Sequence, residues 1–397
     1  MTREVAITGF GVLTAFGFGA DALRDGVFAG RTGFTPVSRF DPTPYRAKYA
    51  ATYEGDGACI PDVPVKPGYT PTQAEVLRAC AVEALRMAGT DGAGAPVVLG
   101  TNGDYAAART FWEDQAAGRD PADRRMLDSL PARLAHRLGE ELGLGHPRLA
   151  FVNACVASTN AIAHGAELIR SGVAHTVVCG GAYLVTEDVF AKFDSGKALS
   201  RRGALRPFSA DRDGLLQGDG AAVLVLEDAA RARARGSEVL ARVAGWGMAA
   251  DAHHVIQPHP QGMGLAAAAD AALRRAGVAP EQLGYINAHG TGTPLNDVAE
   301  TAALHRILGP HAAGVPVSST KSSTGHMLEA TGAVEAVITL LALRDGVLPP
   351  TAGLTDPDPA CDLDHIPGTA RPARIRHALS LNAAFGGVNA ALLLERA

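Results

Sequence analysis

Two stretches of the chain share one pattern and decide the predicted fold: Arg148-Leu-Ala-Phe-Val-Asn-Ala-Cys155 and Val315-Pro-Val-Ser-Ser-Thr-Lys321. Each is a short apolar run, typical of a β-strand, and each leads into a helical pattern. Each is followed further on by a strand pair, which closes with similar apolar runs at residues 220–227 and 389–395. We interpret the two stretches as equivalent parts of a duplicated unit. Their sequence similarity is weak, and chance resemblance is the alternative.

The same alternation of strand-like and helical patterns extends along the whole chain. Val/Ile/Leu-rich runs occur at residues 97–100, 149–152, 176–179 and 223–226, and helical patterns at 131–144, 265–276 and 299–308. Such alternation predicts an α/β fold with a largely buried sheet. We expect the two halves to join near Arg235-Gly-Ser-Glu238, giving domains of residues 1–237 and 238–397. In a duplicated fold, equivalent strand-to-helix junctions can face each other across one pocket.

Composition narrows the function classes. The chain has 397 residues, 47% of them hydrophobic, and a net charge of −5, which does not suggest a nucleic-acid partner. Its five cysteines are odd in number and show no C-x-x-C spacing, which argues against a zinc site or a disulfide framework and fits a reducing cytoplasm. The longest apolar stretch, near residues 336–343, is far short of the ~20 residues that span a bilayer. The N-terminus enters a strand-like run at once, so we expect a cytoplasmic protein without a signal peptide or membrane segment.

Cys155 is the first candidate for chemistry. It stands where an apolar run ends and a helix of small residues begins. The positive end of a helix dipole favours the thiolate, which is the nucleophilic form of cysteine. The alternative is a small buried hydrophobic residue, and this reading suits Cys80 and Cys179 inside their apolar runs.

A second candidate segment, Tyr285 to Asp297, places His289 at the end of a strand-like run. A Gly/Thr loop follows, in which Thr291 and Thr293 offer hydroxyl groups at alternate positions. Asp297 is expected to cap the next helix. A lone histidine in such a place is more often structural than catalytic.

Two further segments complete the set. In residues 318–335, Lys321 and His326 stand at the opening of a helix, and the apolar helical segment contains Glu335. Lys321 is one of only five lysines among 36 basic residues, and it is the natural partner for a buried Glu335 carboxylate. The alternative is a plain cluster of capping residues. In residues 381–389, Phe385 precedes two glycines in a turn between two strands, and a simple hairpin is again the alternative.

Taken together, the four segments resemble, in order and approximate spacing, those of elongating β-ketoacyl-acyl-carrier-protein synthases. The resemblance covers essentially the whole chain, from residue 5 through the Arg206-Pro-Phe-Ser region to Asn389. It implies the thiolase-like fold, in which two duplicated βαβαβ-type halves form five layers, α-β-α-β-α. It also implies a dimer, made either of two copies or with a related ketosynthase or chain-length-factor chain.

The resemblance also implies a role for each motif residue. Cys155 would be the nucleophile, and His289 and His326 the paired active-site histidines. Lys321 would act with Glu335 in support. The gating residue would be Phe385, whose backbone N–H joins that of Cys155 in an oxyanion hole, while Thr291 and Thr293 would touch the phosphopantetheine arm.

The implied reaction is a decarboxylative Claisen condensation of a Cys-bound acyl chain with malonyl-acyl-carrier protein. Its substrates arrive on phosphopantetheine, and no metal or other cofactor is expected. Two alternatives stay open. One is a ketosynthase-like acyltransferase that does not elongate the chain, and the other is a non-catalytic subunit resembling a chain-length factor.

Some residues depart from the family pattern. Ala383 and Ala384 stand where a Phe and a Gly are usual, Asn153 replaces a usual Thr, and Glu329 often corresponds to Gly. Residues 100–105, Gly-Thr-Asn-Gly-Asp-Tyr, are more polar than the usual acyl-pocket segment. We therefore hypothesise a specialised, polyketide-type acyl substrate rather than housekeeping fatty-acid elongation.

Overall fold

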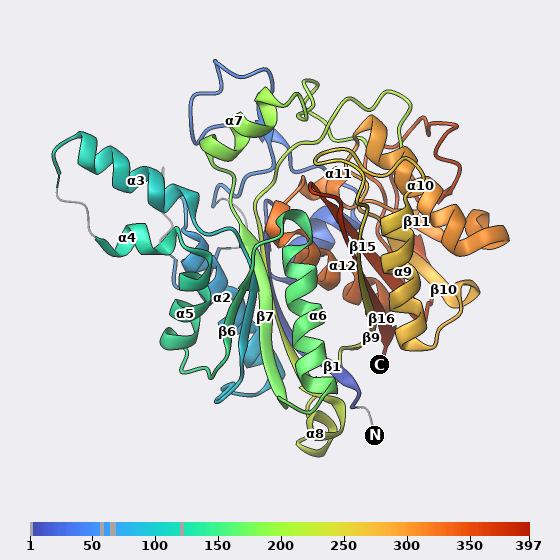
Figure 1. Ribbon diagram of the computed structural model, residues 1–397, viewed down its shortest axis with the longest axis horizontal. Helices are drawn as coiled ribbons and strands as arrows, with labels where there is room; N and C mark the ends of the chain where they lie inside the picture. The colour runs from blue at the N-terminus through green and yellow to red at the C-terminus, as the bar shows by residue number, and fades with distance from the viewer. Residues whose placement is uncertain (1–2, 56–58, 64–68, 120–122) are drawn as a thin grey trace.

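The computed structural model describes residues 3–55, 59–63, 69–119 and 123–397, and its frame is one long mixed sheet (Figure 1). Within these residues the strands follow the order β13-β11-β10-β15-β16-β9-β1-β8-β7-β5-β6, with β2 paired to β1. Their bounds are β1 Val5–Thr14, β2 Gly17–Phe18, β5 Val97–Gly100, β6 Arg148–Phe151, β7 Thr176–Tyr183, β8 Gly220–Asp228, β9 Ala241–Ala250, β10 Leu283–Asn287, β11 Pro316–Ser318, β13 Asp364–His365, β15 His377–Ala384 and β16 Val388–Arg396.

The order of strands repeats from the first half to the second. The series β1-β8-β7-β5-β6 and β9-β16-β15-β10-β11 have the same sequence of pairings: antiparallel, antiparallel, parallel, parallel. The halves meet where β1 pairs with β9 at Ala6–Arg242 and Ile7–Ala241. The predicted duplicated, thiolase-like α/β fold is therefore confirmed. The boundary after residue 237 falls between α8 and β9 and stays a prediction.

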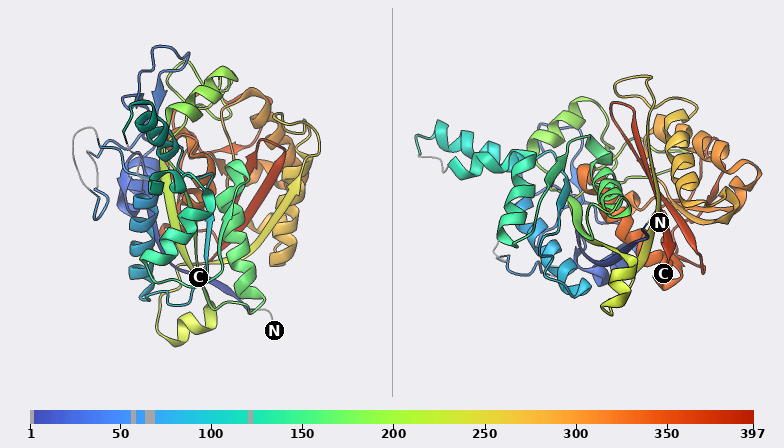
Figure 2. Two further views of the ribbon diagram at one scale, coloured as in Figure 1. Left: turned by 60° about the vertical axis from the view of Figure 1, so that its left-hand side comes forward. Right: turned by 60° about the horizontal axis from the view of Figure 1, so that its bottom comes forward.

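Helices lie on both faces of each half, in five layers (Figure 2). Helices α2 and α5 cover the outer face of the first half, and α9 and α10 lie outside the second. The layer between the two halves is made of α6 and α12, which pack on each other and on strands of both halves. The helices of these layers are α2 Gln73–Ala88, α5 Pro131–Glu141, α6 Ala157–Arg170, α9 Met263–Ala276, α10 Pro294–Leu308 and α12 Thr331–Asp345.

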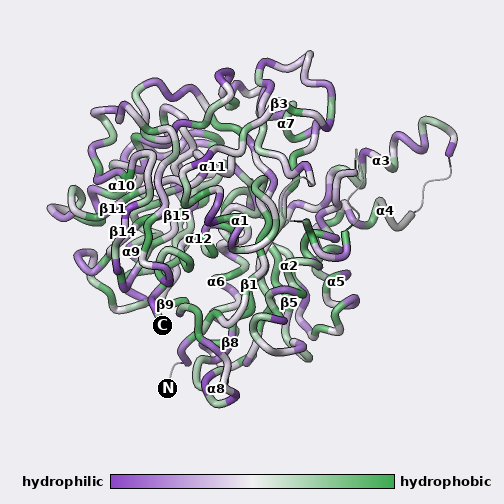
Figure 3. The backbone as a smooth tube through the Cα atoms, turned by 180° about the vertical axis from the view of Figure 1, so that it is seen from behind, coloured by the Kyte–Doolittle hydropathy of each residue, from purple (hydrophilic) through white to green (hydrophobic). Residues whose placement is uncertain are grey.

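The central helices are built from small and apolar residues because they are enclosed on every side. Every residue of α12 from Thr331 to Leu343 is buried, as expected for a helix without a polar face. A Cβ atom on Gly332 would lie 1.9 Å from Oγ1 of Thr159, so only glycine allows α6 and α12 to approach this closely. Hydrophobic segments such as β8 and β9 run through the molecule in Figure 3.

Local signals explain where some helices begin and end. Helix α2 starts at Thr72, whose hydroxyl and backbone form a capping box with Glu75, and it ends at Gly89 in the left-handed conformation. The helix expected over 131–144 ends three residues earlier, and the one expected from residue 299 already begins at Pro294, the N1 position where proline fits best.

Shorter elements surround this frame, and α3 and α4 extend away from the body of the molecule (Figures 1 and 2). They are α1 Ala20–Leu23, α3 Tyr105–Ala116, α4 Asp123–Asp128, α7 Glu187–Ser195, α8 Ala229–Ala234, α11 Lys321–Thr324, β3 Thr35–Pro36, β4 Tyr49–Ala50, β12 Val347–Leu348 and β14 Arg371–Pro372. None of the described helices is long and apolar enough to cross a membrane.

Candidate active site

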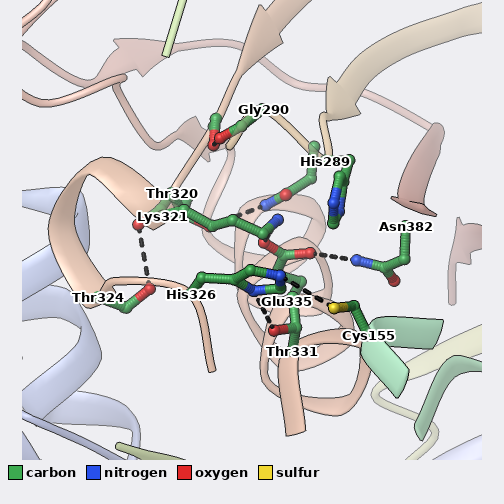
Figure 4. Close-up of polar contacts among 12 residues, drawn as sticks. Cys155, His289, Gly290, Thr320, Lys321, Thr324, His326, Thr331, Glu335 and Asn382 are labelled. Atoms are coloured by element: carbon green, nitrogen blue, oxygen red, sulfur yellow. Dashed lines mark hydrogen bonds and ion pairs between the residues drawn. The ribbon is translucent and has the colours of Figure 1, made fainter. Parts of the chain in front are cut away.

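Cys155 lies at the junction between β6 and α6, in a short 3-10 turn, Ala154–Val156. Its neighbour Ala154 has a φ of 53°, a left-handed conformation that costs a non-glycine residue free energy. The side chain is 7% exposed, and its sulfur lies 3.1 Å from Nε2 of His326 (Figure 4). The strained turn thus presents the thiol to a residue that is 171 positions away in the chain.

The two predicted histidines come from separate elements of the second half. His289 follows β10, and His326 follows α11. Their ring centroids are 5.4 Å apart and the rings are nearly perpendicular, at 83°. His326 Nδ1 lies 3.1 Å from the hydroxyl of Thr331, whereas the buried Nδ1 of His289 has no hydrogen-bond partner among the described residues. Both rings point toward the region in front of the thiol (Figure 4).

Burial sets the protonation state of the two imidazoles and of the Cys155 thiol. It lowers the pKa of His289 and His326 well below 6.5, and the charge of Lys321 adds to this effect. Both imidazoles are therefore neutral near pH 7. Burial and the nearby Glu329 carboxyl raise the pKa of Cys155 to about 12. The expectation of a stabilised thiolate at a helix start is wrong for the resting site, because loss of hydration outweighs the helix end.

Lys321 and Glu335 meet in a fully buried ion pair. The Nζ of Lys321 lies 2.6 Å from Oε1 of Glu335, and both side chains have no exposed surface. The second carboxylate oxygen accepts a hydrogen bond of 2.7 Å from Asn382, whose own amide oxygen accepts one of 2.5 Å from Thr159. This chain of contacts links α11, α12, β15 and α6 beneath the histidines. It places a positive charge close to both imidazoles without exposing it.

Two carboxylates that the sequence reasoning did not place in the site hold the loop after His289. Glu300 accepts hydrogen bonds from the backbone N–H of His289 at 2.6 Å and of Gly290 at 2.7 Å. Asp297 accepts from the N–H of Phe208 at 2.8 Å and of Gly292 at 3.2 Å, so it does not cap the helix. Burial raises the pKa of Glu300 to about 7 and that of Asp297 to about 6. Their position on the buried face of α10, just after the loop, is the signal that could have identified them.

One cavity of about 270 Å³ connects most of the predicted residues. Its lining includes Cys155, His289, Thr291, Thr293, His326 and Phe385, whereas Lys321 and Glu335 lie behind it. The ring of Phe385 is 46% exposed and stacks on Phe193, with centroids 5.7 Å apart. The hydroxyls of Thr291 and Thr293 lie 2.9 Å apart on the same wall. The arrangement is a thiol in a cavity with largely apolar walls, with two neutral imidazoles beside the sulfur and the Phe385 ring in the wall.

Comparison with known proteins agrees with this geometry. The family description "Beta-ketoacyl synthase, N-terminal domain" matches residues 2–232, and "Beta-ketoacyl synthase, C-terminal domain" matches residues 240–355. The chain belongs to the β-ketoacyl synthase family.

Individual members of the family align over nearly the full length. The tetracenomycin polyketide synthase ketoacyl synthase alpha subunit of Streptomyces glaucescens is 37% identical over 99% of this chain and 97% of its own. The 3-oxoacyl-[acyl-carrier-protein] synthase 2 of Synechocystis is 35% identical over 99% of this chain and 98% of its own. The solved structure of the ishigamide ketosynthase/chain length factor covers all of both chains with a TM-score of 0.89 and 33% identity.

The residues that depart from the expected family pattern lie close to the active-site groups in this β-ketoacyl synthase. Ala383 and Ala384 line the cavity next to Phe385, where they offer less bulk than the usual Phe and less backbone freedom than the usual Gly. Asn153, two residues before the nucleophile candidate, has a buried amide oxygen without a partner among the described residues. Glu329 accepts a hydrogen bond from the side chain of Asn102.

No group of three or more His, Cys, Asp or Glu side chains in the described part of this β-ketoacyl synthase is arranged to hold a metal ion. Of the remaining cysteines, Cys80 and Cys179 are fully buried in apolar surroundings, as the alternative reading of a buried thiol predicts for them. Burial raises the pKa of both thiols far above its ordinary value. Cys155 differs from them in facing a cavity and a histidine.

Proposed function

We propose that this β-ketoacyl synthase condenses an acyl chain held on Cys155 with a malonyl group carried by an acyl carrier protein. The observation that carries the proposal is the convergence of one thiol and two neutral imidazoles in a single cavity. This convergence disfavours a non-catalytic, chain-length-factor-like role, because such a subunit needs none of the three groups in working geometry.

The first step forms the acyl-enzyme. The sulfur of Cys155 attacks the acyl thioester while its proton passes to Nε2 of His326, 3.1 Å away. In the proposal, the backbone N–H groups of Cys155 and Phe385 stabilise the oxyanion that forms on the thioester carbonyl. The carrier's thiol takes the proton as it leaves, and the acyl chain remains on Cys155.

The second step uses both histidines as hydrogen-bond donors. Decarboxylation of the malonyl thioester leaves an electron pair that becomes an enolate on the thioester oxygen. Two neutral imidazoles can donate N–H bonds to this oxygen, and their lowered pKa keeps them uncharged before the reaction. For His326 this requires a change of tautomer between the steps, so that Nε2 carries the proton and Nδ1 accepts from the hydroxyl of Thr331. Carbon dioxide leaves in the decarboxylation. The enolate carbon then attacks the acyl carbonyl on Cys155, the carbon–sulfur bond breaks, and the Cys155 thiolate leaves and is reprotonated, which gives a β-ketoacyl product two carbons longer on the carrier.

The supporting residues have separate proposed tasks. Lys321, held by Glu335, keeps the imidazoles neutral through its positive charge. Thr291 and Thr293 face the cavity and are suited to contact the amide groups of phosphopantetheine. Phe385 closes the cavity between the two steps by moving from its stack on Phe193. No other cofactor enters these steps.

We further propose a polyketide-type substrate, a cytoplasmic location and a dimer, either of two copies or with a related chain. The similarity to a polyketide ketoacyl synthase alpha subunit and to a ketosynthase/chain length factor supports the polyketide and dimer proposals. The similarity to a 3-oxoacyl-[acyl-carrier-protein] synthase supports the carrier partner. The location rests on the cysteine pattern of the sequence.

The test is intact-mass analysis after mixing the protein with acyl-loaded and malonyl-loaded carrier proteins. We expect an acyl adduct on the wild type, release of carbon dioxide and a product two carbons longer. Cys155→Ala should lose the adduct and the product, and Cys179→Ala, which removes another buried thiol, should keep both. An adduct without carbon dioxide or elongated product would contradict condensation and indicate an acyltransferase instead.

A further inference from the structure

Two of the unusual residues, Asn102 and Glu329, contact each other although they are 227 positions apart in the chain. Asn102 follows β5, and Glu329 lies in a 3-10 turn, Leu328–Ala330, between His326 and α12. The side-chain amide of Asn102 donates a hydrogen bond to Oε1 of Glu329, and Tyr105 interacts with the same amide. Substitutions in two separate segments therefore form one polar cluster.

This cluster lies beside the nucleophile. The turn that contains Glu329 packs against the turn that contains Cys155 and against β7. The Glu329 carboxyl raises the pKa of Cys155 more than Lys321 lowers it. Neither Glu329 nor Asn102 lines the cavity that leads to the thiol from outside. The pair therefore adjoins the turn that carries the sulfur but does not line the cavity described above.

The pair is unusual for such a buried place because a carboxyl is enclosed there with few polar neighbours. Glu329 is 5% exposed, and it receives hydrogen bonds from the Asn102 side chain and from its own backbone N–H. Burial raises its pKa to about 7, so near neutrality about half of the molecules hold a protonated carboxyl, which can both donate and accept. A protonated carboxyl also avoids repelling the oxyanion that forms on the adjacent thioester. An apolar wall would serve a saturated chain better, because burying a polar group without full compensation costs free energy.

We propose that Glu329 and Asn102 form a polar subsite for the acyl chain on Cys155 and favour acyl groups that carry an oxygen atom close to the thioester. The inference rests on the proposed acylation of Cys155 and adds a specificity-determining residue to it. A saturated chain makes no hydrogen bond to the Glu329 carboxyl. An oxygen-bearing chain adds one, and this difference selects the substrate.

The test compares two carrier-bound acyl groups of equal length, butanoyl and 3-hydroxybutanoyl. Intact-mass time courses give the rate of acyl transfer to Cys155 from each carrier protein. Because loss of hydrogen bonding penalises the unmatched substrate, we expect the wild type to react at least about tenfold faster with 3-hydroxybutanoyl. Glu329→Leu should abolish or reverse this ratio. Glu329→Gln, which keeps a donor and an acceptor, should retain it.

The controls separate this inference from the proposed function. Glu281→Leu, on an exposed turn, should leave the ratio of rates unchanged, and thermal melting of each variant reports whether it is folded. Equal rates in the wild type, or an unchanged ratio in folded Glu329→Leu, would overturn the subsite while leaving condensation intact. If Glu329→Leu does not fold, loss of the ratio in Asn102→Ala supports the subsite, and an unchanged ratio in that variant overturns it. Failure of the wild type to form any adduct would overturn the proposed function and this inference together.

Discussion

The two equivalent strand-to-helix junctions of the duplicated fold have become opposites in chemistry. In the first half, β6 leads into α6 through Ala154 and Cys155, among small residues without buried charge, and Cys155 is the candidate nucleophile there. In the second half, the path from β11 to α12 passes through a run of buried polar residues, Ser318 to Thr324, and reaches His326. The same strand-to-helix topology thus places the candidate nucleophile at the first junction and the buried charged and polar groups at the second.

This difference shows why duplication suits a two-step reaction. The first junction needs only space around a sulfur atom, which small residues provide. The second must hold a buried lysine, which pairs with the fully enclosed Glu335, and Glu335 in turn accepts a hydrogen bond from Asn382. Because these residues lie in the turns after the strands, the residues of either junction can differ without altering the strand order that brings the two junctions together. Substitutions at either junction test this division of roles.

The largest expected effect separates the two histidines of the second half. His289→Ala should slow condensation about 10²–10³-fold through loss of one oxyanion donor, while the rate of acyl transfer to Cys155 stays nearly unchanged. His326→Ala should slow both steps, because His326 also contacts the sulfur. Single-turnover mass analysis of each step measures this. Equal slowing of acyl transfer in both variants would show that the histidines do not divide the work as proposed.

The next effect concerns the buried ion pair that the first junction lacks. Lys321→Met leaves the Glu335 carboxylate buried and unpaired, which should lower the free energy of unfolding by about 3–5 kcal/mol. Arg344→Met is the control, since it removes an exposed partner of Glu238 and should cost less than about 1 kcal/mol. Urea unfolding of both variants provides the comparison. Similar losses in the two variants would mean that the enclosed pair contributes no more than a surface pair.

A pH-dependent effect sharpens the contrast around Glu329. Its pKa is raised from 4.5 to about 7 in the folded state, so the folded protein holds a proton that the unfolded chain has released. Its contribution to stability therefore falls as pH rises from 4.5 to 7 and is constant above that range. In Glu329→Gln the fall should be shallower, by about one proton at pH 6. Urea unfolding between pH 5 and 8 measures the slope, and an unchanged slope would contradict a protonated Glu329.

The smallest effect tests the strain at the first junction. Ala154 has a φ of 53°, and glycine adopts this conformation without the steric cost. Relief of strain, partly offset by the greater freedom of glycine in the unfolded chain, should make Ala154→Gly more stable by about 0.5–1 kcal/mol. Ala161→Gly, seven residues later in the interior of α6, should instead be less stable by about 1 kcal/mol. Thermal unfolding of the pair measures both, and losses in both variants would contradict strain at Ala154.

Prediction from the sequence succeeded where the signal is local or is carried by motifs. The alternation of runs predicted the α/β class, and β5 has the expected bounds of residues 97–100. Motif order predicted which side chains gather around the cavity. Prediction failed for Asp297, which was expected to cap a helix, because proline at position 294 starts the helix earlier and frees the carboxylate for the loop.

The sequence by itself determined the order of strands and helices, the duplicated pattern and the identity of the reactive groups, because these depend on periodicity and residue type. Only the tertiary structure decided the protonation of these groups and their contacts with distant residues. The thiol of Cys155 is expected to be acidic at a helix start, but enclosure raises its pKa to about 12. The contact between Asn102 and Glu329 joins segments that no local pattern relates. Hydration and long-range contact are properties of the packed chain, and they set the chemistry of the residues that the sequence names.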